Sequence, residues 1–502
     1  METFHHLLYG FNVALQPENL AFAFLGTVIG TLVGVIPGLG PSAAMSILLP
    51  ATFGISPTGS IIMLAGIYYG AQYGGSTTSI LVNIPGEASS VVTCSDGYQM
   101  ARQGRAGPAL GMAAIASFIA GSIGVLAISF LATPLVKLAL RFGPPEYFAL
   151  MCVGLTILTF LAHGSMLKAL IIAIIGFFLG TVGIDTTTGI HRFTFGQREL
   201  MEGIGLIPVV MGVFGIAEIL SNIDKGLEIN VYESKIKGLF PNSEDWKRCI
   251  GAILRGTGIG LFLGILPGGG PVIASFTSYA VEKRFSKHPE EFGTGVIEGV
   301  ANPEAANNAG AQGCFIPMLT LGIPSNVTTA LLLGALMIHG ITPGPLLMKN
   351  RPDLFWGFIT SMYIGNLMLL VLNMPLIPLW VKLLKIPYPI LSPFILLFCL
   401  IGVYTVNNNV FDIYVATTFG IFGYLMRKLG FEAAPFILAV VIGPMLEKAL
   451  RQSLEMSGGD FSIFVTRPIS GALFVTAFLL LTLPLIPKLF IRKKLATLEE
   501  AD

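Results

Sequence analysis

Long apolar stretches recur along almost the whole chain, with short polar or Gly/Pro-rich segments between them. Many have about 20 residues, the length that a helix needs to cross the ~30 Å hydrocarbon core of a bilayer. Several are shorter or are interrupted by Pro and Gly, which indicates broken or re-entrant helices. The pattern predicts an all-α polytopic membrane protein with roughly 11 to 14 membrane segments. The stretches lie at about 20–50, 58–84, 108–133, 147–162, 167–184, 204–220, 250–280, 305–341, 355–384, 390–406, 413–426, 435–446 and 469–490.

One sizeable hydrophilic stretch interrupts this pattern, because ten of the residues between 221 and 248 are charged. It divides the chain into two apolar halves of similar length. We therefore expect a first membrane repeat with a Pro-Gly hairpin at 1–220 and a polar cytoplasmic linker at 221–249. A second membrane repeat with its own Pro-Gly hairpin should follow at 250–487, and a C-terminal tail, basic and then acidic, at 488–502.

The two halves share short motifs in the same order. Gly34–Pro41 (GVIPGLGP) recurs as Gly264–Pro271 (GILPGGGP), a shift of 267 − 37 = 230 residues. The later pairs are Gly70-Ala71-Gln72 with Gly310-Ala311-Gln312, Ile84-Pro85-Gly86 with Ile323-Pro324-Ser325, and Gly107-Pro108 with Gly344-Pro345. Four matching landmarks in one order predict two structural repeats.

The distribution of basic residues indicates how the repeats are oriented, because cytoplasmic loops are enriched in Lys and Arg. No Lys or Arg precedes the first Pro-Gly block, whereas the linker before the second repeat carries Lys235, Lys237, Lys247 and Arg248. We therefore expect an inverted-topology pair, with the N-terminus in the periplasm and the basic C-terminus in the cytoplasm.

Composition agrees with a membrane protein and excludes several functions. Of the 502 residues, 53% are hydrophobic and 11% are charged, and the mean hydropathy is +0.78; soluble domains carry about a quarter charged residues. A net charge of +1 without a basic stripe argues against a nucleic-acid partner. The sequence has no P-loop, HExxH or Ser/His/Asp constellation, and its five cysteines are scattered, so we expect neither an enzyme nor a cofactor or metal site, apart from Na⁺ as a coupling ion.

The Pro-Gly-x-Gly-Pro blocks must break their helices, because Pro lacks the amide donor and Gly removes the steric bias towards helical dihedrals. Broken backbone persists at membrane depth only where protein, water or a ligand satisfies its polar groups. Half-helices that start at Pro41 and Pro271 would point free N–H groups at the breaks and so form an anion site without cationic side chains. Close helix packing is the alternative explanation for these glycines.

Uncharged polar residues lie between the landmarks, and their amide and hydroxyl groups could donate to a carboxylate or ligate Na⁺. Hydrogen bonding between helices is the alternative role. We predict substrate binding by Pro37, Gly38, Gly40, Pro41, Ser42, Gln72, Ser76, Thr77, Thr78, Pro267, Gly268, Gly269, Gly270, Pro271, Asn307, Asn308 and Gln312. We predict coupling-ion binding by Asn83, Asn302, Ser325 and Asn326.

Three carboxylates adjoin these clusters: Glu87, Glu298 and Glu304. A carboxylate at membrane depth is a proton or sodium site by default. At the water interface each would instead be a solvated loop residue, and the sequence supports both readings equally. Arg255, near the start of a span, could pair with substrate, although anchoring at the interface is the more common role of such residues.

Two motifs together carry a family resemblance. Ile-Pro-Gly-x-Gly-Pro at 36–41 and Tyr-Gly-x-Gln-Tyr-Gly-Gly-Ser-Thr-Thr-Ser-Ile at 69–80 resemble the large membrane subunit of the bacterial tripartite tricarboxylate transporters. The resemblance covers nearly the full length and includes blocks 34–50, 68–108, 264–271 and 302–345. It implies that the transport core consists of the tips Pro37–Ser42 and Pro267–Pro271 with the stretches Gly70–Ser79 and Asn302–Gln312.

The resemblance implies a secondary carrier in the bacterial inner membrane that works with a small integral membrane subunit and a periplasmic solute-binding protein. Such a carrier imports citrate or other carboxylates by symport with Na⁺ or H⁺. Dicarboxylates such as tartrate, and aromatic acids, remain open as substrates. A self-sufficient ion-coupled carboxylate symporter is the alternative, and a membrane enzyme or a channel is a more distant rival.

Overall fold

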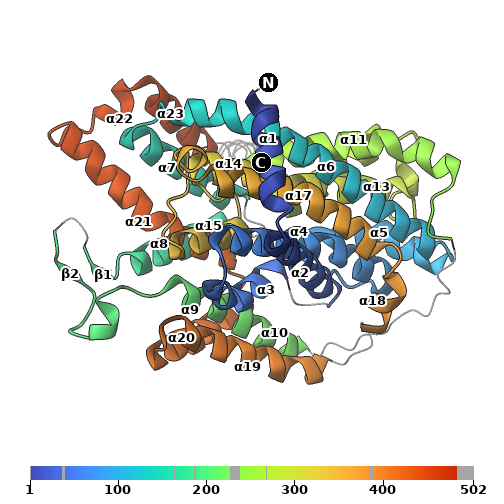
Figure 1. Ribbon diagram of the computed structural model, residues 1–502, viewed down its shortest axis with the longest axis horizontal. Coiled ribbons are helices and arrows are strands. Elements are labelled where there is room, and N and C mark those ends of the chain that lie inside the picture. The colour runs from blue at the N-terminus through green and yellow to red at the C-terminus, as the bar shows by residue number, and fades with distance from the viewer. Residues whose placement is uncertain are drawn as a thin grey trace, which may run out of the picture.

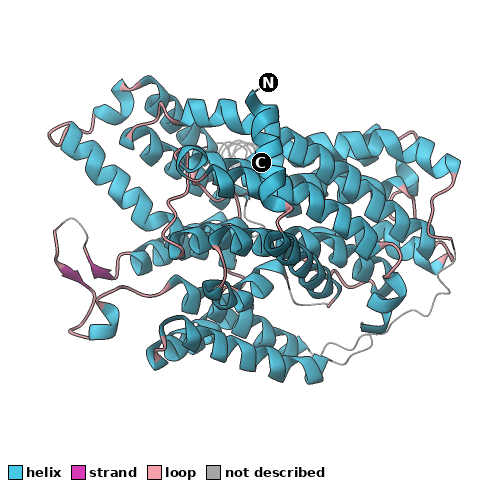
Figure 2. Cartoon of the chain, viewed as in Figure 1, coloured by secondary structure: helices cyan, strands magenta, loops and turns pink. Residues whose placement is uncertain are grey.

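The computed structural model shows an almost entirely helical chain (Figure 1). The structure describes residues 2–36, 40–161, 165–185, 188–225, 238–266, 268, 270–383 and 388–482. Within these residues the strands are limited to an antiparallel pair, β1 (Gly183–Ile184) and β2 (His191–Arg192). This pair projects from the helical body at the left of Figure 2.

The first half contains α1 (Glu2–Ala14), α2 (Pro17–Val35), α3 (Pro41–Leu48), η1 (Pro50–Gly54), α4 (Pro57–Val82), η2 (Ala88–Ser90), α5 (Val91–Arg102), α6 (Ala106–Ala139), α7 (Pro144–Leu161), α8 (Met166–Gly180), η3 (Arg198–Leu200), α9 (Leu206–Val210), the π-helix η4 (Met211–Ile216) and α10 (Ala217–Lys225). The second half contains α11 (Ser243–Ile265), α12 (Gly270–Phe285), η5 (Pro289–Glu291), α13 (Glu298–Gly313), α14 (Phe315–Leu321), α15 (Val327–Ile338), α16 (Leu347–Asn350), α17 (Pro352–Asn373), α18 (Ile377–Leu383), α19 (Tyr388–Asn407), α20 (Val410–Lys428), α21 (Ala433–Met456), α22 (Ile463–Thr466) and α23 (Pro468–Thr482).

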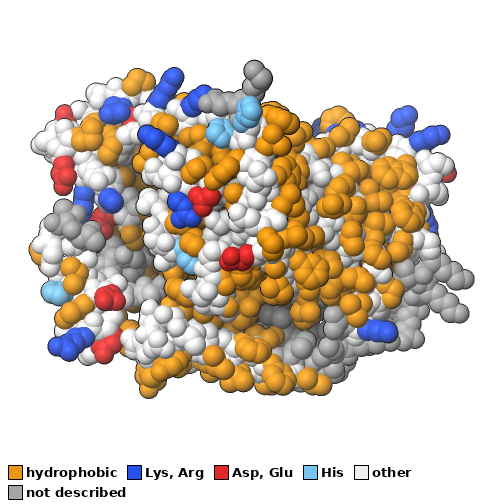
Figure 3. Space-filling model, in the orientation of Figure 1, with side chains coloured by type: hydrophobic (Ala, Val, Ile, Leu, Met, Phe, Trp, Pro, Cys, Tyr) orange, Lys and Arg blue, Asp and Glu red, His pale blue; other side chains and the backbone are white. Residues whose placement is uncertain are grey.

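Six helical segments of the described chain are long and apolar enough to cross a bilayer. They are Pro17–Val35, Ala106–Ala139, Leu206–Asp224, Ser243–Ile265, Pro352–Asn373 and Ala433–Met456. Shorter apolar helices accompany them, and hydrophobic side chains cover a broad area of the face in Figure 3. The predicted all-α, multi-pass membrane class is confirmed, and the larger number of segments predicted from the sequence stays a prediction.

Both Pro-Gly blocks lie where one helix stops and the next starts. Helix α2 ends at Val35 and α3 begins at Pro41, while α11 ends at Ile265 and α12 begins at Gly270. Four predicted site residues, Pro37, Gly38, Pro267 and Gly269, lie outside the described residues, as do residues 226–237 of the predicted linker and the whole predicted tail.

Glycines allow the helices before each break to pack tightly on the helices that follow. A Cβ at Gly26, Gly30 or Gly34 of α2 would lie 2.3, 2.6 or 2.3 Å from the carbonyl oxygens of Met63, Ile67 and Ala71 on α4. A Cβ at Gly256, Gly260 or Gly264 of α11 would lie 2.4, 2.3 or 2.3 Å from those of Asn302, Ala306 and Gly310 on α13. Close packing therefore explains Gly34 and Gly264, the first residue of each block.

A second pair of breaks follows these packed helices. Helix α4 ends at Asn83, which has a φ of 57°, and α14 ends at Gly322, which has a φ of 72°. The chain then resumes through capping boxes, Glu87 with Ser90 before η2 and Asn326 with Thr329 before α15.

A buried aromatic cluster lies between α4, α14 and α17. Tyr68, Phe315 and Phe358 are fully buried, and Phe315 makes edge-to-face contacts with Tyr68 at 5.7 Å and with Phe358 at 5.1 Å between ring centroids. This packed centre holds the breaks from the two halves in fixed positions relative to each other.

Candidate functional site

A cavity of about 600 Å³ lies where the breaks of the two halves meet. Its lining residues are Gly40–Ala43 and Pro85–Ala88 from the first half, Gly268, Gly270–Ile273 and Ser325–Thr328 from the second, and Tyr68, Gln72, Phe214, Glu218, Arg427, Glu432 and Ala434. All four breaks contribute backbone to its wall, so segments more than 200 residues apart in the sequence form one site.

Three helices begin at this cavity: α3, α12 and α15. The first intrahelical bond of α3 runs from Ala44 N to Gly40 O at 3.2 Å, so the N–H groups of Ser42 and Ala43 precede the ladder. Each helix also presents the positive end of its dipole at its N-terminus. The wall therefore suits an anion, and its attraction comes from backbone groups.

Hydrogen bonds join the halves across the cavity. Ser42 Oγ lies 3.2 Å from Thr328 Oγ1, and Asn326 Nδ2 donates to Tyr68 Oη at 2.7 Å. Within the second half, Gly268 N donates to Ser325 O at 2.7 Å. The hydroxyl of Ser325 is fully buried and has no hydrogen-bond partner among the described residues, so it is a polar atom that the described protein leaves unsatisfied.

Glu87 lies in the cavity wall and is buried among donors. Its carboxylate accepts Ser89 N at 2.9 Å, Ser89 Oγ, and Asn307 Nδ2 from α13 at 3.2 Å. The side-chain amide of Gln72 reaches the same carboxylate from α4. Glu87 is therefore not a solvated loop residue, and of the two readings of the sequence only a buried carboxylate fits.

A second buried carboxylate, Glu304, lies deeper, between α4, α5 and α13. Ser76 Oγ donates to it at 2.5 Å, Thr93 Oγ1 also donates, and Asn308 Nδ2 on the same helix donates to Ser117 Oγ at 2.7 Å. Ser76 and Thr77 line a separate small cavity of about 10 Å³. The predicted residues Ser76, Thr77 and Asn308 thus lie near Glu304 rather than in the large cavity.

The remaining predicted site residues fall into two groups, according to whether they line the large cavity. Gly40, Pro41, Ser42, Gln72, Gly268, Gly270, Pro271, Ser325 and Asn326 line the large cavity, and Asn307 contacts it through Glu87. Four others do not line it. Thr78 donates to Val35 O at 2.7 Å, Asn302 accepts from Ser278 Oγ at 2.5 Å, Gln312 packs on α6, and Asn83 is an exposed helix end. For Thr78 and Asn302 this is the alternative role, hydrogen bonding between helices.

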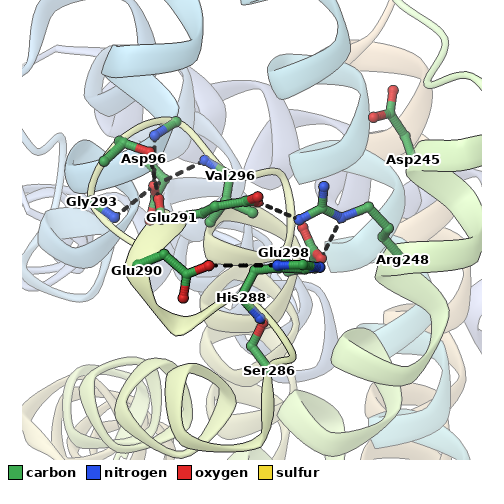
Figure 4. A network of polar contacts seen from close by, with 12 residues as sticks. Asp96, Asp245, Arg248, Ser286, His288, Glu290, Glu291, Gly293, Val296 and Glu298 are labelled. Carbon is green, nitrogen blue, oxygen red and sulfur yellow. Dashed lines mark hydrogen bonds and ion pairs between the residues drawn. The ribbon is translucent and has the colours of Figure 1, made fainter.

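The other charged candidates pair with each other away from the cavity. Arg255 donates to both oxygens of Glu282, at 2.8 and 2.5 Å. Arg248 donates to Glu298 at 2.6 Å and to Glu291 at 2.8 Å (Figure 4). This hydrogen bond from Arg248 lowers the pKa of Glu291 from its usual value.

Three cavity features had no counterpart among the predicted site residues. Tyr68 could have been suspected, because it directly precedes the Tyr-Gly-x-Gln motif. The ion pair of Arg427 with Glu218 joins α20 to α10 at the rim, and nothing in the sequence connects residues 209 positions apart. Glu432, the N-cap of α21, also faces the cavity without any motif to mark it.

Most of the chain is similar in sequence to known proteins. Residues 20–438 match the Tripartite tricarboxylate transporter TctA family. An uncharacterized 52.8 kDa protein in the TAR-I ttuC' 3'region of Agrobacterium vitis is 52% identical over 500 residues, 100% of both chains. Another uncharacterized protein, in the TAR-II ttuC' 3'region, is 54% identical over 230 residues, 46% of this chain and 95% of its own length. No solved structure matches the chain.

Proposed function

The chain belongs to the tripartite tricarboxylate transporter TctA family, and on that premise we propose that it is the large transmembrane subunit of a secondary importer of tricarboxylates or related organic anions. Membership of this family supports a transporter subunit rather than an enzyme. Uptake would be driven by a cation gradient and would need a small integral membrane subunit and a periplasmic solute-binding protein. We place it in the bacterial inner membrane, with a periplasmic N-terminus and a cytoplasmic C-terminus.

The observation that carries this proposal is the meeting of three helix N-termini from both halves at one cavity. Broken helices that point their N-termini at a common site are a typical way to bind an anionic substrate in membrane transporters. Arg427, the one cation among the described lining residues, is already paired with Glu218. Backbone donors, with Ser42, Ser325 and Asn326, are therefore the groups that we assign to the substrate carboxylates.

We further propose that the halves are inverted-topology repeats. In support, glycines spaced by four residues pack α2 on α4 and α11 on α13 with nearly the same carbonyl contacts. Capping boxes also recur 239 residues apart, at Glu87 with Ser90 and at Asn326 with Thr329, since 326 − 87 = 239 and 329 − 90 = 239. Alternating access would then move one set of elements around the shared cavity.

Labelled citrate uptake into membrane vesicles tests the function. We expect uptake to require an imposed cation gradient and the solute-binding protein. The double variant Pro37→Ala with Gly38→Ala should remove uptake while the protein remains in the membrane. Normal uptake by that variant would reject the hairpin-tip site, and uptake that needs no binding protein would favour a self-sufficient symporter.

A further inference from the structure

Four side chains from three elements meet at the cavity wall: Gln72 from α4, Glu87 and Ser89 at η2, and Asn307 from α13. We propose that this cluster is the coupling site and that the coupling ion is a proton carried by Glu87, with the amides of Gln72 and Asn307 turning to match each protonation state. This inference rests on the proposed function, because it names the ion that moves with the organic anion.

The geometry around Gln72 supports the proposal. The end of its amide that faces the cluster lies 3.1 and 3.2 Å from the two carboxylate oxygens of Glu87, 2.5 Å from Asn307 Oδ1 and 2.8 Å from Ser89 Oγ. These are hydrogen-bond distances, and the two amide hydrogens of Gln72 can be directed at Asn307 Oδ1 and at the Glu87 carboxylate. A proton fits this cluster without moving these atoms apart, because it is carried on the Glu87 carboxyl itself.

The cluster has two complete hydrogen-bond arrangements. An ionised carboxylate only accepts, so Gln72 must present its N–H₂ to Glu87 and to Asn307 Oδ1, while Asn307 Nδ2 donates to Glu87. A protonated carboxyl is also a donor, so both amides would turn by half a rotation: Asn307 Oδ1 then accepts from Glu87, and its nitrogen donates to Gln72 Oε1. No side chain needs to leave its place, and the proton stays on Glu87 until the cavity opens to the other side.

The charge on Glu87 couples the proton to the substrate. No Lys, Arg or His among the described residues forms an ion pair with Glu87, and the ionised carboxylate faces the cavity in which an organic anion would sit. Two like charges at close range repel each other, so the anion binds well only when Glu87 is protonated. By linkage, the bound anion strengthens the binding of the proton by the same factor.

Other ionisable groups surround the site and must be considered with it. Tyr68 on α4 and Glu304 on α13 are close enough to interact electrostatically with Glu87. Glu218, Arg427 and Glu432 line the same cavity. Several other ionisable residues on the elements packed against η2 have partners: Asp96 bonds Tyr279, Tyr73 bonds Asn366, Glu282 pairs with Arg255, Glu298 pairs with Arg248, and Cys94 donates to Ser90 O. The same elements also carry Tyr69, whose buried hydroxyl has no hydrogen-bond partner among the described residues, and Tyr98, Arg102, Lys283 and Arg284.

The capping position of the second half provides an internal comparison. Asn326 caps α15 as Glu87 caps η2, and each accepts a backbone N–H inside its own cap and contacts the opposite half, through Tyr68 and Asn307 respectively. Asn326 is a neutral amide and cannot titrate. One proton site for the two caps is therefore the arrangement that the structure supports.

The test is the pH dependence of anion binding to the full-length purified chain, measured with citrate and tartrate from pH 6 to 9 in choline buffer. Because citrate itself titrates in this range, wild type is compared with Glu87→Gln at each pH. Above the pH at which Glu87 loses its proton, the ratio of wild-type Kd to variant Kd should rise about tenfold per pH unit, the slope of one linked proton. Asp353→Asn, a surface carboxylate paired with Arg351, is the control and should keep the wild-type pH dependence.

A pH-independent ratio, or wild-type binding that follows Na⁺ and not pH, would overturn the proposal while leaving the transport function in place. Failure of wild type to bind either anion would count against the transport function itself and remove this inference with it. If Glu87→Gln does not fold, Gln72→Met replaces it: loss of the amide donors should shift the loss of affinity to higher pH, and an unshifted profile would reject the mechanism.

Discussion

Replacing Asp96 by Ala tests how α5 in the first half is attached to the second half. Asp96 is fully buried, and its Oδ1 accepts the N–H groups of Gly293, Gly295 and Val296 at 2.9, 2.9 and 3.0 Å. Its Oδ2 accepts Tyr279 Oη at 2.8 Å. Figure 4 shows Asp96 within the loop that carries Gly293 and Val296. Both glycines have positive φ, 94° and 111°, which turns neighbouring N–H groups towards one anion.

Truncation removes one charged acceptor and leaves four donors without it. A buried donor that loses its partner costs about 1–3 kcal/mol, and breaking a buried charged network costs about 3–5 kcal/mol in total once relaxation and water are allowed. We expect Asp96→Ala to lower the free energy of unfolding by about 3–5 kcal/mol. Asp96→Asn should cost less, because it keeps one acceptor oxygen and loses mainly the bond from Tyr279.

The assay is the midpoint of thermal unfolding in detergent, with Asp353→Ala as the matched control. Asp353 pairs with Arg351 through a side chain that is 35% exposed, so its loss should cost about 0–1 kcal/mol. The expected order of destabilisation is Asp96→Ala, then Asp96→Asn, then Asp353→Ala. An unfolding midpoint of Asp96→Ala equal to that of the control would refute the view that this carboxylate holds the loop.

Two further predictions concern packing and the cavity. Gly260→Ala should lower the unfolding midpoint, because its Cβ would lie 2.3 Å from Ala306 O and push α11 away from α13. Gly258→Ala, whose Cβ would have no neighbour within 4 Å, should leave the midpoint unchanged, and equal midpoints for the two variants would contradict the packing argument. Ser325→Ala should leave the unfolding midpoint unchanged, because its hydroxyl has no partner in the described chain. It should weaken citrate binding by about tenfold, the value of one hydrogen bond, and unchanged binding by calorimetry would remove Ser325 from the site.

Local chemistry made the helix breaks predictable. Pro and Gly act through the dihedrals and donors of their own residues, so the sequence alone indicates that α2 and α11 must end where they do. The pairing of Gly256 with Asn302 O was not predictable in detail, although small residues at spacing four suggest some close contact. The helical membrane class and the positions of the helix breaks therefore follow from local rules, whereas the tertiary contact partners of each residue do not.

Glu87 shows why the site could be predicted only in part. It follows a Pro-Gly break, a position that is equally typical of a solvated loop. Its burial depends on Asn307, 220 positions further along, and on the packing of α13. Asn302 shows the opposite case: its amide is predicted to bind the coupling ion, and in the structure it bonds Ala252 O and Glu282. Residue type indicated a polar role in both cases, and only the tertiary contact separates a candidate site from a structural hydrogen bond.

The same contacts explain how the proposed anion cavity can contain carboxylates at all. Arg427 neutralises Glu218, so the attraction for an anion comes from helix N-termini, and Glu87 opposes it whenever that residue is ionised. A permanent cation in the wall would bind the anion without any need for a co-transported ion. When the carboxylate must first be protonated, the anion binds only together with a proton. An importer driven by a cation gradient requires such linked binding.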